Sequence, residues 1–256
     1  MPVKTTLSTK ASSINRALDE IGDKWCLLIL QEVFWGINTF NERLAGTGAS
    51  RGVLSNRLSW LESMGYLRKD IIAKGQKRPT YHMTKKASEL YRTGLMAMVW
   101  ERKYFTTPDL DSVELIHDRC GKAFWPMMEC SHCNQSVLST DVSFHKGPGA
   151  KNDTRITKTR RRSSNLSASE DRGKTLYNNL INLLGDRWTA NIIALAFHGF
   201  NRFDDFHTEL PVATNILADR LKLLVNEGIF YQQPYQVSPL RYDYHLTDKG
   251  RDLFPY

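Results

Sequence analysis

The chain has 256 residues, of which 41% are hydrophobic and 24% are charged. This composition is typical of a folded globular protein and excludes a fibrous or wholly disordered chain. The 35 Lys and Arg residues outnumber the 27 Asp and Glu residues, which gives a net charge of +8. A basic chain favours nucleic acid or another anionic partner.

The sequence also predicts the compartment of the protein. No apolar run is long enough to cross a bilayer, and the N-terminal segment lacks the apolar region of a secretory signal. Four cysteines without an export signal indicate reduced thiols rather than a disulfide framework. We therefore expect a cytoplasmic protein associated with DNA, of the kind found in bacteria, without membrane contact.

One module occurs twice in the sequence. A shift of 163 residues places GDKW at 22–25 on GDRW at 185–188, and the same shift holds without a gap to the end of the chain. Further equivalent pairs are Leu54 and Leu217, Arg57 and Arg220, Gly65 and Gly228, and Thr84 and Thr247. Such internal similarity predicts two copies of one fold.

The repeat defines the expected domain organisation. Module 1 covers residues 12–108 and module 2 covers 175–256. A small Cys/His segment at 113–145 and a basic linker at 146–174 lie between them. The linker is rich in Gly, Ser, Lys and Arg, which is typical of a flexible connection.

The elements of module 1 follow from hydrophobic periodicity and capping residues. Asp23 and Ser50 are expected N-caps. The helix after Asp23 is expected to end at Gly36, and the helix after Ser50 is expected to end at Gly65. The expected elements are helices at 14–21, 24–35, 40–44 and 51–64, two strands within 66–83 around a basic tip, and a final helix from 84 to 105. We predict a mainly α fold with small β-hairpins, organised as two winged helix-turn-helix modules.

The residues of both modules resemble one family. RALDEIGDKWCLLILQEVFWG and GVLSNRLSWLESMGYL in module 1 are similar to the HxlR-type winged-helix transcription regulators, as are LLGDRWTANIIALAFHG and YHLTDKGRDL in module 2. The resemblance covers about two thirds of the chain. It implies a DNA-binding regulator that commonly dimerises through its terminal helices.

Two positions depart from that family pattern. Many members have a cysteine before the first helix, where some sense quinones, aldehydes or oxidants, but this chain has Ser12 and Thr175 there. Thiol sensing at that position is therefore not expected. Module 2 also ends soon after Thr247, so most of its last helix is missing. This argues against a family-style dimer through module 2, and against pairing of the two modules as a pseudo-dimer.

A helical wheel separates the core face of the 51–64 helix from its expected DNA-reading face. Leu54, Leu58 and Leu61 share the core face, with Arg57 on their flank as a structural ion pair or helix anchor. The residues expected to read DNA in module 1 are Ser50, Arg51, Ser55, Asn56 and Ser59. The candidates in module 2 are Thr214, Asn215 and Lys222. Asp219 replaces Asn56 there and repels phosphate, so module 2 is expected to bind weakly.

The wing of module 1 is also more basic than the wing of module 2. Lys69, Lys74, Lys77 and Arg78 could reach the DNA backbone or minor groove in module 1, or simply be solvated, whereas module 2 has only Arg241. Net charge is +8 over 1–105, −4 over 106–145, +6 over 146–174 and −2 over 175–256. Because phosphate neutralisation dominates affinity for DNA, module 1 and the linker are expected to supply most of it.

The Cys/His segment contains two short-spaced pairs. His117-x2-Cys120 and Cys130-x2-Cys133 could close on one tetrahedral Zn²⁺ as a structural Cys3His site, with His132 as a reserve ligand. A metal-free reduced hairpin and a Cys130/Cys133 redox pair are the alternatives. Cys26 lies in a core helix and is expected to be a buried small hydrophobe.

The sequence therefore predicts a sequence-specific transcription regulator that binds double-stranded DNA, with the second helix of each helix-turn-helix in the major groove and the wing on phosphate. A homodimer through the 84–105 helix would set the half-site spacing. The alternative is a protein-interaction adaptor, a role that acidic module 2 could fill. The sequence shows no nucleophile-base pair and no open metal site, so we do not expect an enzyme.

Overall fold

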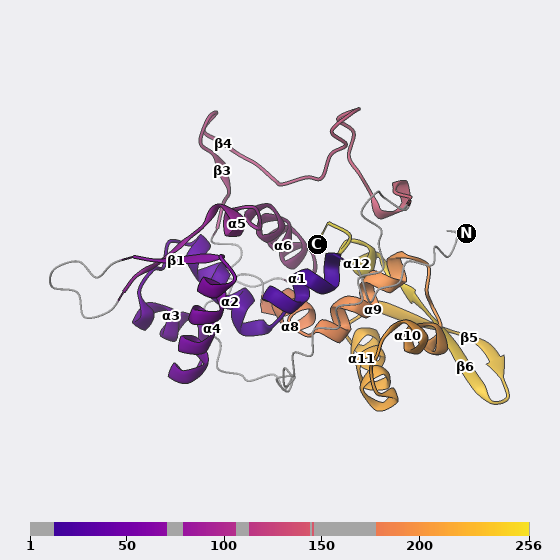
Figure 1. Cartoon of the computed structure of the whole chain (residues 1–256). Helices are drawn as coiled ribbons and strands as arrows, with labels where there is room; N and C mark the ends of the chain where they lie inside the picture. Colours follow the sequence, from indigo (N-terminus) through magenta and orange to yellow (C-terminus); the bar gives the residue numbers. More distant parts are fainter. Residues whose placement is uncertain (1–12, 71–78, 106–112, 144, 146–177, 256) are drawn as a thin grey trace. The chain divides into compact units, whose positions relative to one another are not determined.

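A computed structural model describes residues 13–70, 79–105, 113–143, 145 and 178–255 (Figure 1). Among these residues, module 1 contains six helices and a two-stranded sheet. They are α1 (Ser13–Ile21), α2 (Lys24–Phe34), α3 (Phe40–Thr47), α4 (Arg51–Ser63), β1 (Leu67–Lys69), β2 (Tyr81–Met83), α5 (Lys85–Ser88) and α6 (Tyr91–Tyr104). This order confirms the expected winged-helix arrangement. The expected single helix at 84–105 is two helices, α5 and α6, which meet at Glu89 and Leu90.

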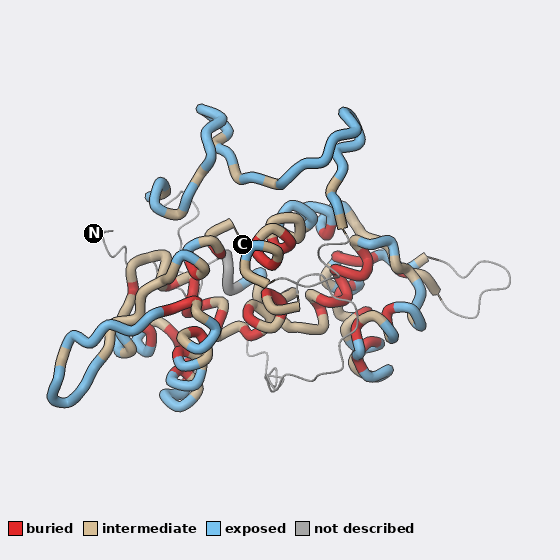
Figure 2. The backbone as a smooth tube through the Cα atoms, turned by 180° about the vertical axis from the view of Figure 1, so that it is seen from behind, coloured by how far each residue is buried: buried red, intermediate tan, exposed pale blue. Residues whose placement is uncertain are grey.

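The core of module 1 lies between α2, α4 and the wing sheet. Cys26, Ile29 and Leu30 of α2 are buried against the apolar face of α4, because an amphipathic helix places such residues on one side. The antiparallel pairing of β1 with β2 sets Leu67 opposite Met83. Figure 2 shows the buried residues, in red, mostly along helical segments. Burial of Cys26 confirms its expected role as a small hydrophobe.

The ends of the helices form where the sequence predicts them. The Asp23 side chain accepts a hydrogen bond from the Cys26 amide at 3.2 Å, and Ser50 caps α4 by accepting one from Val53. Gly65 follows α4 with a φ of 75°, a left-handed conformation that glycine adopts without a steric penalty. These caps fix where α4 begins and ends.

Module 2 repeats this arrangement. Its elements are α8 (Asn178–Leu184), α9 (Arg187–Phe197), α10 (Phe203–Glu209), α11 (Thr214–Asn226), β5 (Phe230–Val237), β6 (Leu240–Leu246) and the short α12 (Asp248–Arg251). Leu217, Leu221 and Leu224 of α11 are buried as their equivalents in α4 are. The repeat therefore holds in three dimensions as well as in sequence.

The described residues form two compact units that differ from the two sequence repeats. The N-terminal unit comprises the described parts of Glu20–Pro126 and Arg162–Asp186, so it includes α8. The C-terminal unit comprises the described parts of Met1–Asp19, Met127–Arg161 and Arg187–Tyr256. The first helix of module 2 thus belongs to the unit that module 1 builds.

The Cys/His segment contains little regular structure. β3 (Ile116–His117) pairs with β4 (Lys122–Ala123), and the 3-10 helix η2 (Ser139–Asp141) follows further along. None of the described residues between 113 and 143 is buried. Figure 2 accordingly colours the described residues of this segment as exposed or intermediate.

Candidate nucleic-acid interface

The polar face of α4 is exposed to solvent. The side chains on this face are those that the helical wheel predicts to read DNA: Ser50, Arg51, Ser55, Asn56 and Ser59. Gly52 lies on the same face and is also exposed. The structure thus places the five residues that the helical wheel predicts, four on α4 and one at its N-cap, along one accessible side of this helix.

The opposite face of α4 is held firmly in the core. Leu54, Leu58 and Leu61 are buried, as the periodicity predicts. Arg57, on their flank, donates from Nε to Oδ1 of Asp23 at 3.0 Å, and both side chains are partly buried. Arg57 therefore acts as a helix anchor. Because the same Asp23 oxygen accepts from the Cys26 amide, one carboxylate ties α4 to the start of α2.

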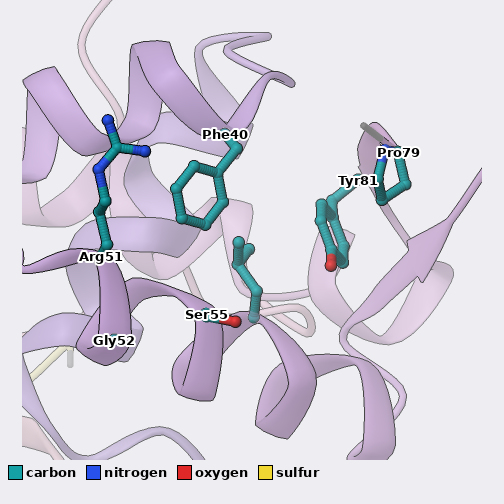
Figure 3. Close-up of a pocket in the computed structure, with 7 residues that line it drawn as sticks. Phe40, Arg51, Gly52, Ser55, Pro79 and Tyr81 are labelled. Carbon is teal, nitrogen blue, oxygen red and sulfur yellow. The ribbon is translucent and has the colours of Figure 1, made fainter. Parts of the chain in front are cut away.

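A hollow of about 470 Å³ adjoins the exposed face of α4. Its lining comes from α3, α4 and the base of the wing: Phe40, Arg51, Gly52, Ser55, Leu58, Pro79 and Tyr81. Figure 3 shows Arg51 and Ser55 on α4, with the rings of Phe40 and Tyr81 lying across the hollow. Arg51 and Ser55 therefore face a concave surface with an apolar floor. This hollow could not be predicted from the sequence, because its walls come from elements far apart in the chain.

A buried arginine behind the hollow was also missed by sequence reasoning. Arg43 of α3 is fully buried, donates from Nη2 to the main-chain oxygen of Tyr81 at 2.8 Å and lies 5.6 Å from that ring. Burial lowers the pKa of Arg43 to about 10, with Tyr81, Glu32 and Glu42 acting in the opposite direction. Burial raises the pKa of Glu32, and the charge of Arg43 partly offsets this shift.

The repeat shows that the two buried charged residues are a feature of module 1 rather than a requirement of the fold. Leu195 occupies the position of Glu32 in module 2, and Phe206 occupies that of Arg43, both fully buried. Gly46 completes the arrangement in module 1, since a Cβ there would lie 2.5 Å from Oε2 of Glu32. In module 2 a guanidinium also reaches the wing, because Arg202 donates from Nε to Oδ1 of Asp243 at 3.0 Å, but this pair lies at the surface rather than in the core.

The wing of module 1 is described only near its base. Lys69 ends β1 and is exposed, and its Cα pairs with that of Tyr81 in β2. Lys74, Lys77 and Arg78, which are predicted to reach DNA, lie outside the described residues. Their contribution stays a prediction.

Module 2 presents a different surface at the equivalent positions. Thr214, Asn215 and Lys222 are exposed on α11, but Asp219 is exposed beside them. On the wing, Arg241 lies 3.4 Å from the carboxylate of Asp204, and Ala213 caps α11 without a side-chain hydrogen bond. Asp219 places a carboxylate at the position that Asn56 has in module 1, and Asp204 places a second one beside Arg241. These negative charges make this face less favourable for phosphate.

The cysteine and histidine pairs each form a turn. His117 Nδ1 lies 3.3 Å from Cys120 Sγ. The backbone amides of Cys133 and His132 lower the pKa of the Cys130 thiol by hydrogen bonding. Among the described residues, no group of three or more His, Cys, Asp or Glu side chains is gathered as a metal site. The predicted Cys3His site therefore stays a prediction.

The fold and this exposed helix define a helix-turn-helix protein with two modules. The HxlR-like helix-turn-helix family model matches residues 20–109 and 183–256, so the chain belongs to this family in a tandem form. This confirms the family and fold class expected from the sequence. No helix among the described residues is both long and apolar enough to cross a membrane.

Similar proteins carry corresponding names. MT3179 of Mycobacterium tuberculosis, an HTH-type transcriptional regulator, is 30% identical over 56% of this chain and 90% of its own. YvaP of Bacillus subtilis, another HTH-type transcriptional regulator, is 36% identical over 29% of this chain and 70% of its own. The crystal structure of PA1607 aligns with 56% of this chain and 100% of its own, at a TM-score of 0.48 and 24% identity.

Proposed function

We propose that the chain is a transcription regulator that binds duplex DNA through module 1, with α4 in the major groove and the wing near the phosphate backbone. The observation that carries this proposal is the exposed polar face of α4, held in place by three buried leucines and by the Arg57–Asp23 pair. A helix of this size fits the major groove of B-DNA. Regulation by DNA binding, rather than catalysis, agrees with membership of a helix-turn-helix family.

The chemistry of the exposed face suits base reading. The Asn56 amide can pair with the N6 and N7 edge of adenine, and the Arg51 guanidinium can pair with guanine or contact a phosphate. Ser50, Ser55 and Ser59 supply hydroxyls that can bond to either kind of group. The apolar floor of the hollow beside Ser55 could accept a thymine methyl group.

The charge distribution supports the same assignment. Residues 1–105 have a net charge of +8, whereas 175–256 have −2. Release of counterions from DNA makes such binding fall steeply as the salt concentration rises. We therefore expect module 1 and the basic linker to supply the salt-sensitive part of the affinity.

Module 2 is a candidate for a second function, as a protein-interaction adaptor. The exposed Asp219 and the pairing of Arg241 with Asp204 support this candidate, because both reduce the positive potential of its recognition face. Under this proposal module 2 contributes little to DNA affinity. Charge reversal at Lys222 would then leave DNA binding almost unchanged.

We also propose that two chains associate as a homodimer through the 85–105 helices, as the family resemblance implies. In the N-terminal unit, α6 packs against α8, and its residues Arg92 and Lys103 are exposed. Dimerisation would therefore use the surface of α6 that α8 leaves open. Light scattering over a concentration series tests this, and a monomer at the concentration that saturates DNA would overturn it.

The proposed function is tested by selecting bound sequences from a random duplex library with the full chain, and by measuring affinity across a salt series. A steep loss of affinity with salt and an enriched motif are expected. A palindromic motif would support a homodimer, and an asymmetric motif would indicate that two unlike modules of one chain read the DNA. No binding at low salt would overturn the proposal and favour protein partners.

A further inference from the structure

A cavity of about 130 Å³ lies between α2, α6 and the start of the Cys/His segment. All of these elements belong to the N-terminal unit. The end of α2 supplies Phe34 and Trp35, α6 supplies Tyr91 and Met98, and residues 113–116 form the remaining wall. Since a cavity of about 150 Å³ can hold a benzene molecule, this one has room for a single small ring.

The cavity has a buried floor and an open mouth. Met98 is 4% exposed and lies at the floor. Trp35 is 44% exposed and Tyr91 is 46% exposed, and Glu114 is exposed as well, so these three side chains lie at the mouth. A small ligand therefore has a way in from solvent.

The wall formed by residues 113–116 is held in place by hydrogen bonds. Arg102 of α6 donates from Nη1 to the main-chain oxygen of Val113 at 2.9 Å, and its guanidinium lies 4.7 Å from the centre of the Trp125 ring. The amide of Phe124 donates to the main-chain oxygen of Leu115 at 2.9 Å, next to the pairing of β3 with β4. The chain that closes the cavity is therefore positioned against α6 although little of it is buried.

The repeat separates what the fold requires from what module 1 adds. Phe34 and Tyr91 meet edge to face with ring centroids 5.8 Å apart, and the equivalent Phe197 and Phe254 of module 2 do so at 5.5 Å. This ring pair therefore belongs to the packing of the module. Glu114 lies outside the residues that repeat in module 2, so the wall that carries it is an addition to module 1.

The lining favours a ligand that combines a ring with a positive charge. Transfer of an apolar ring from water to the apolar interior is favourable, and the thioether of Met98 can add a sulfur–aromatic contact. Among the described residues that line the cavity, Glu114 alone is charged. The aromatic side chains of Trp35 and Tyr91 lie at the mouth with it, and the faces of such rings attract cations.

We propose that this cavity binds a small aromatic amine in its cationic form. The apolar floor takes the ring, and Glu114, Trp35 and Tyr91 at the mouth take the ammonium group. An exposed carboxylate and exposed aromatic faces each add a modest attraction, so a cationic ring should bind about three- to tenfold more tightly than a neutral ring of the same size. Binding does not require DNA and is measured on the full-length chain alone.

Benzylamine, a cation at neutral pH, and benzyl alcohol, its neutral counterpart, are the probes. Each is titrated into the chain at constant ionic strength, to about 10 mM because so small a ligand binds weakly. Methyl NMR signals of Leu95, Met98 and Val113 should shift with both probes, and benzylamine should show the lower Kd. Glu114→Gln should remove this preference and leave the Kd of benzyl alcohol unchanged. Asp118→Asn, an exposed change on the same segment outside the lining, is the matched control and should keep the preference.

Two further variants locate the bound probe. Leu95→Phe enlarges a side chain of the lining and should abolish the shifts from both probes. Trp35→Ala, at the exposed mouth, should weaken benzylamine more than benzyl alcohol.

Three results would each overturn the proposal: no shift of the lining methyl signals, equal Kd values for the two probes, or the same loss of preference in Asp118→Asn as in Glu114→Gln. Shifts of these signals on dilution of the chain, with none from either probe, would assign the cavity to contact with a second copy and would overturn it as well.

Discussion

The buried guanidinium of Arg43 in α3 donates a hydrogen bond to the main-chain oxygen of Tyr81 in β2, at 2.8 Å. This bond joins the helix before α4 to the base of the wing. The hollow beside α4 lies against the same strand, with Tyr81 in its wall. A buried positive charge, which the carboxylate of Glu32 helps to stabilise, therefore ties α3 to the base of the wing in module 1.

Replacing Arg43 alone should destabilise the chain strongly. Arg43→Phe removes the buried hydrogen bond to the main-chain oxygen of Tyr81 and the positive charge that lowers the pKa of buried Glu32, which should cost about 1–3 kcal/mol. The double variant Glu32→Leu/Arg43→Phe copies the apolar pair of module 2 and should regain most of that loss. Urea denaturation of both single variants and the double variant measures the coupling. Additive effects of the two changes would contradict a charge interaction between Arg43 and Glu32.

The Arg57–Asp23 pair should matter for stability and not for the choice of bases. Arg57→Met removes one partly buried partner of Asp23, and we expect the free energy of unfolding to fall by about 1–2 kcal/mol. The bound sequence motif should stay the same, because Arg57 lies on the flank of α4 that faces the core. Thermal denaturation with motif selection checks both points. A changed motif at unchanged stability would make Arg57 a DNA-reading residue.

Glu101 should hold α8 in the N-terminal unit. Its buried carboxylate accepts hydrogen bonds from the amides of Asn179 at 3.1 Å and Leu180 at 3.0 Å, and from the Asn179 side chain at 2.6 Å. Glu101→Gln keeps the shape but loses the charge, and should lower the free energy of unfolding by about 2 kcal/mol. Hydrogen exchange should show faster exchange in α8. Exposed Glu89→Gln is the control, and equal effects from both variants would refute the proposed role.

Stability should depend on the protonation of His198, which follows the last turn of α9. Burial lowers its pKa below the ordinary 6.5, so the folded state binds fewer protons than the unfolded state when the pH falls below that value. Above pH 6.5 the protonation of His198 therefore leaves the free energy of unfolding unchanged. As the pH falls below that value, it lowers the free energy of unfolding. His198→Asn should flatten this dependence in urea denaturation across pH, whereas exposed His207→Asn should not. An unchanged slope in His198→Asn would contradict this.

The fold and much of the recognition face could be predicted from the sequence because local patterns determine them. The spacing of Leu54, Leu58 and Leu61 identifies the buried face of α4, and Ser50 and Gly65 mark its ends. The exposed face then follows by geometry. The repeat adds an independent check, since its equivalent leucines are buried in α11 as well.

Other features could not be predicted because they depend on tertiary contacts. Arg43 lies in a polar stretch of α3, where an arginine normally indicates a solvated face. Its burial follows only from tertiary contacts such as those with Tyr81. The grouping of α8 with module 1 depends on Glu101, which lies 78 residues away from Asn179 along the chain. Neither relationship has a signature in the local sequence.

The central claim, that module 1 reads DNA through α4, is tested most directly by comparing two matched variants on the selected duplex. Asn56→Ala and Asp219→Ala change exposed residues at equivalent positions of α4 and α11. Affinity across a salt series should fall by about 5- to 150-fold for Asn56→Ala, since a bidentate base contact is worth about 1–3 kcal/mol. Asp219→Ala should bind as well as the unaltered chain. Full affinity and sequence preference in Asn56→Ala, with a loss in Asp219→Ala, would contradict the account.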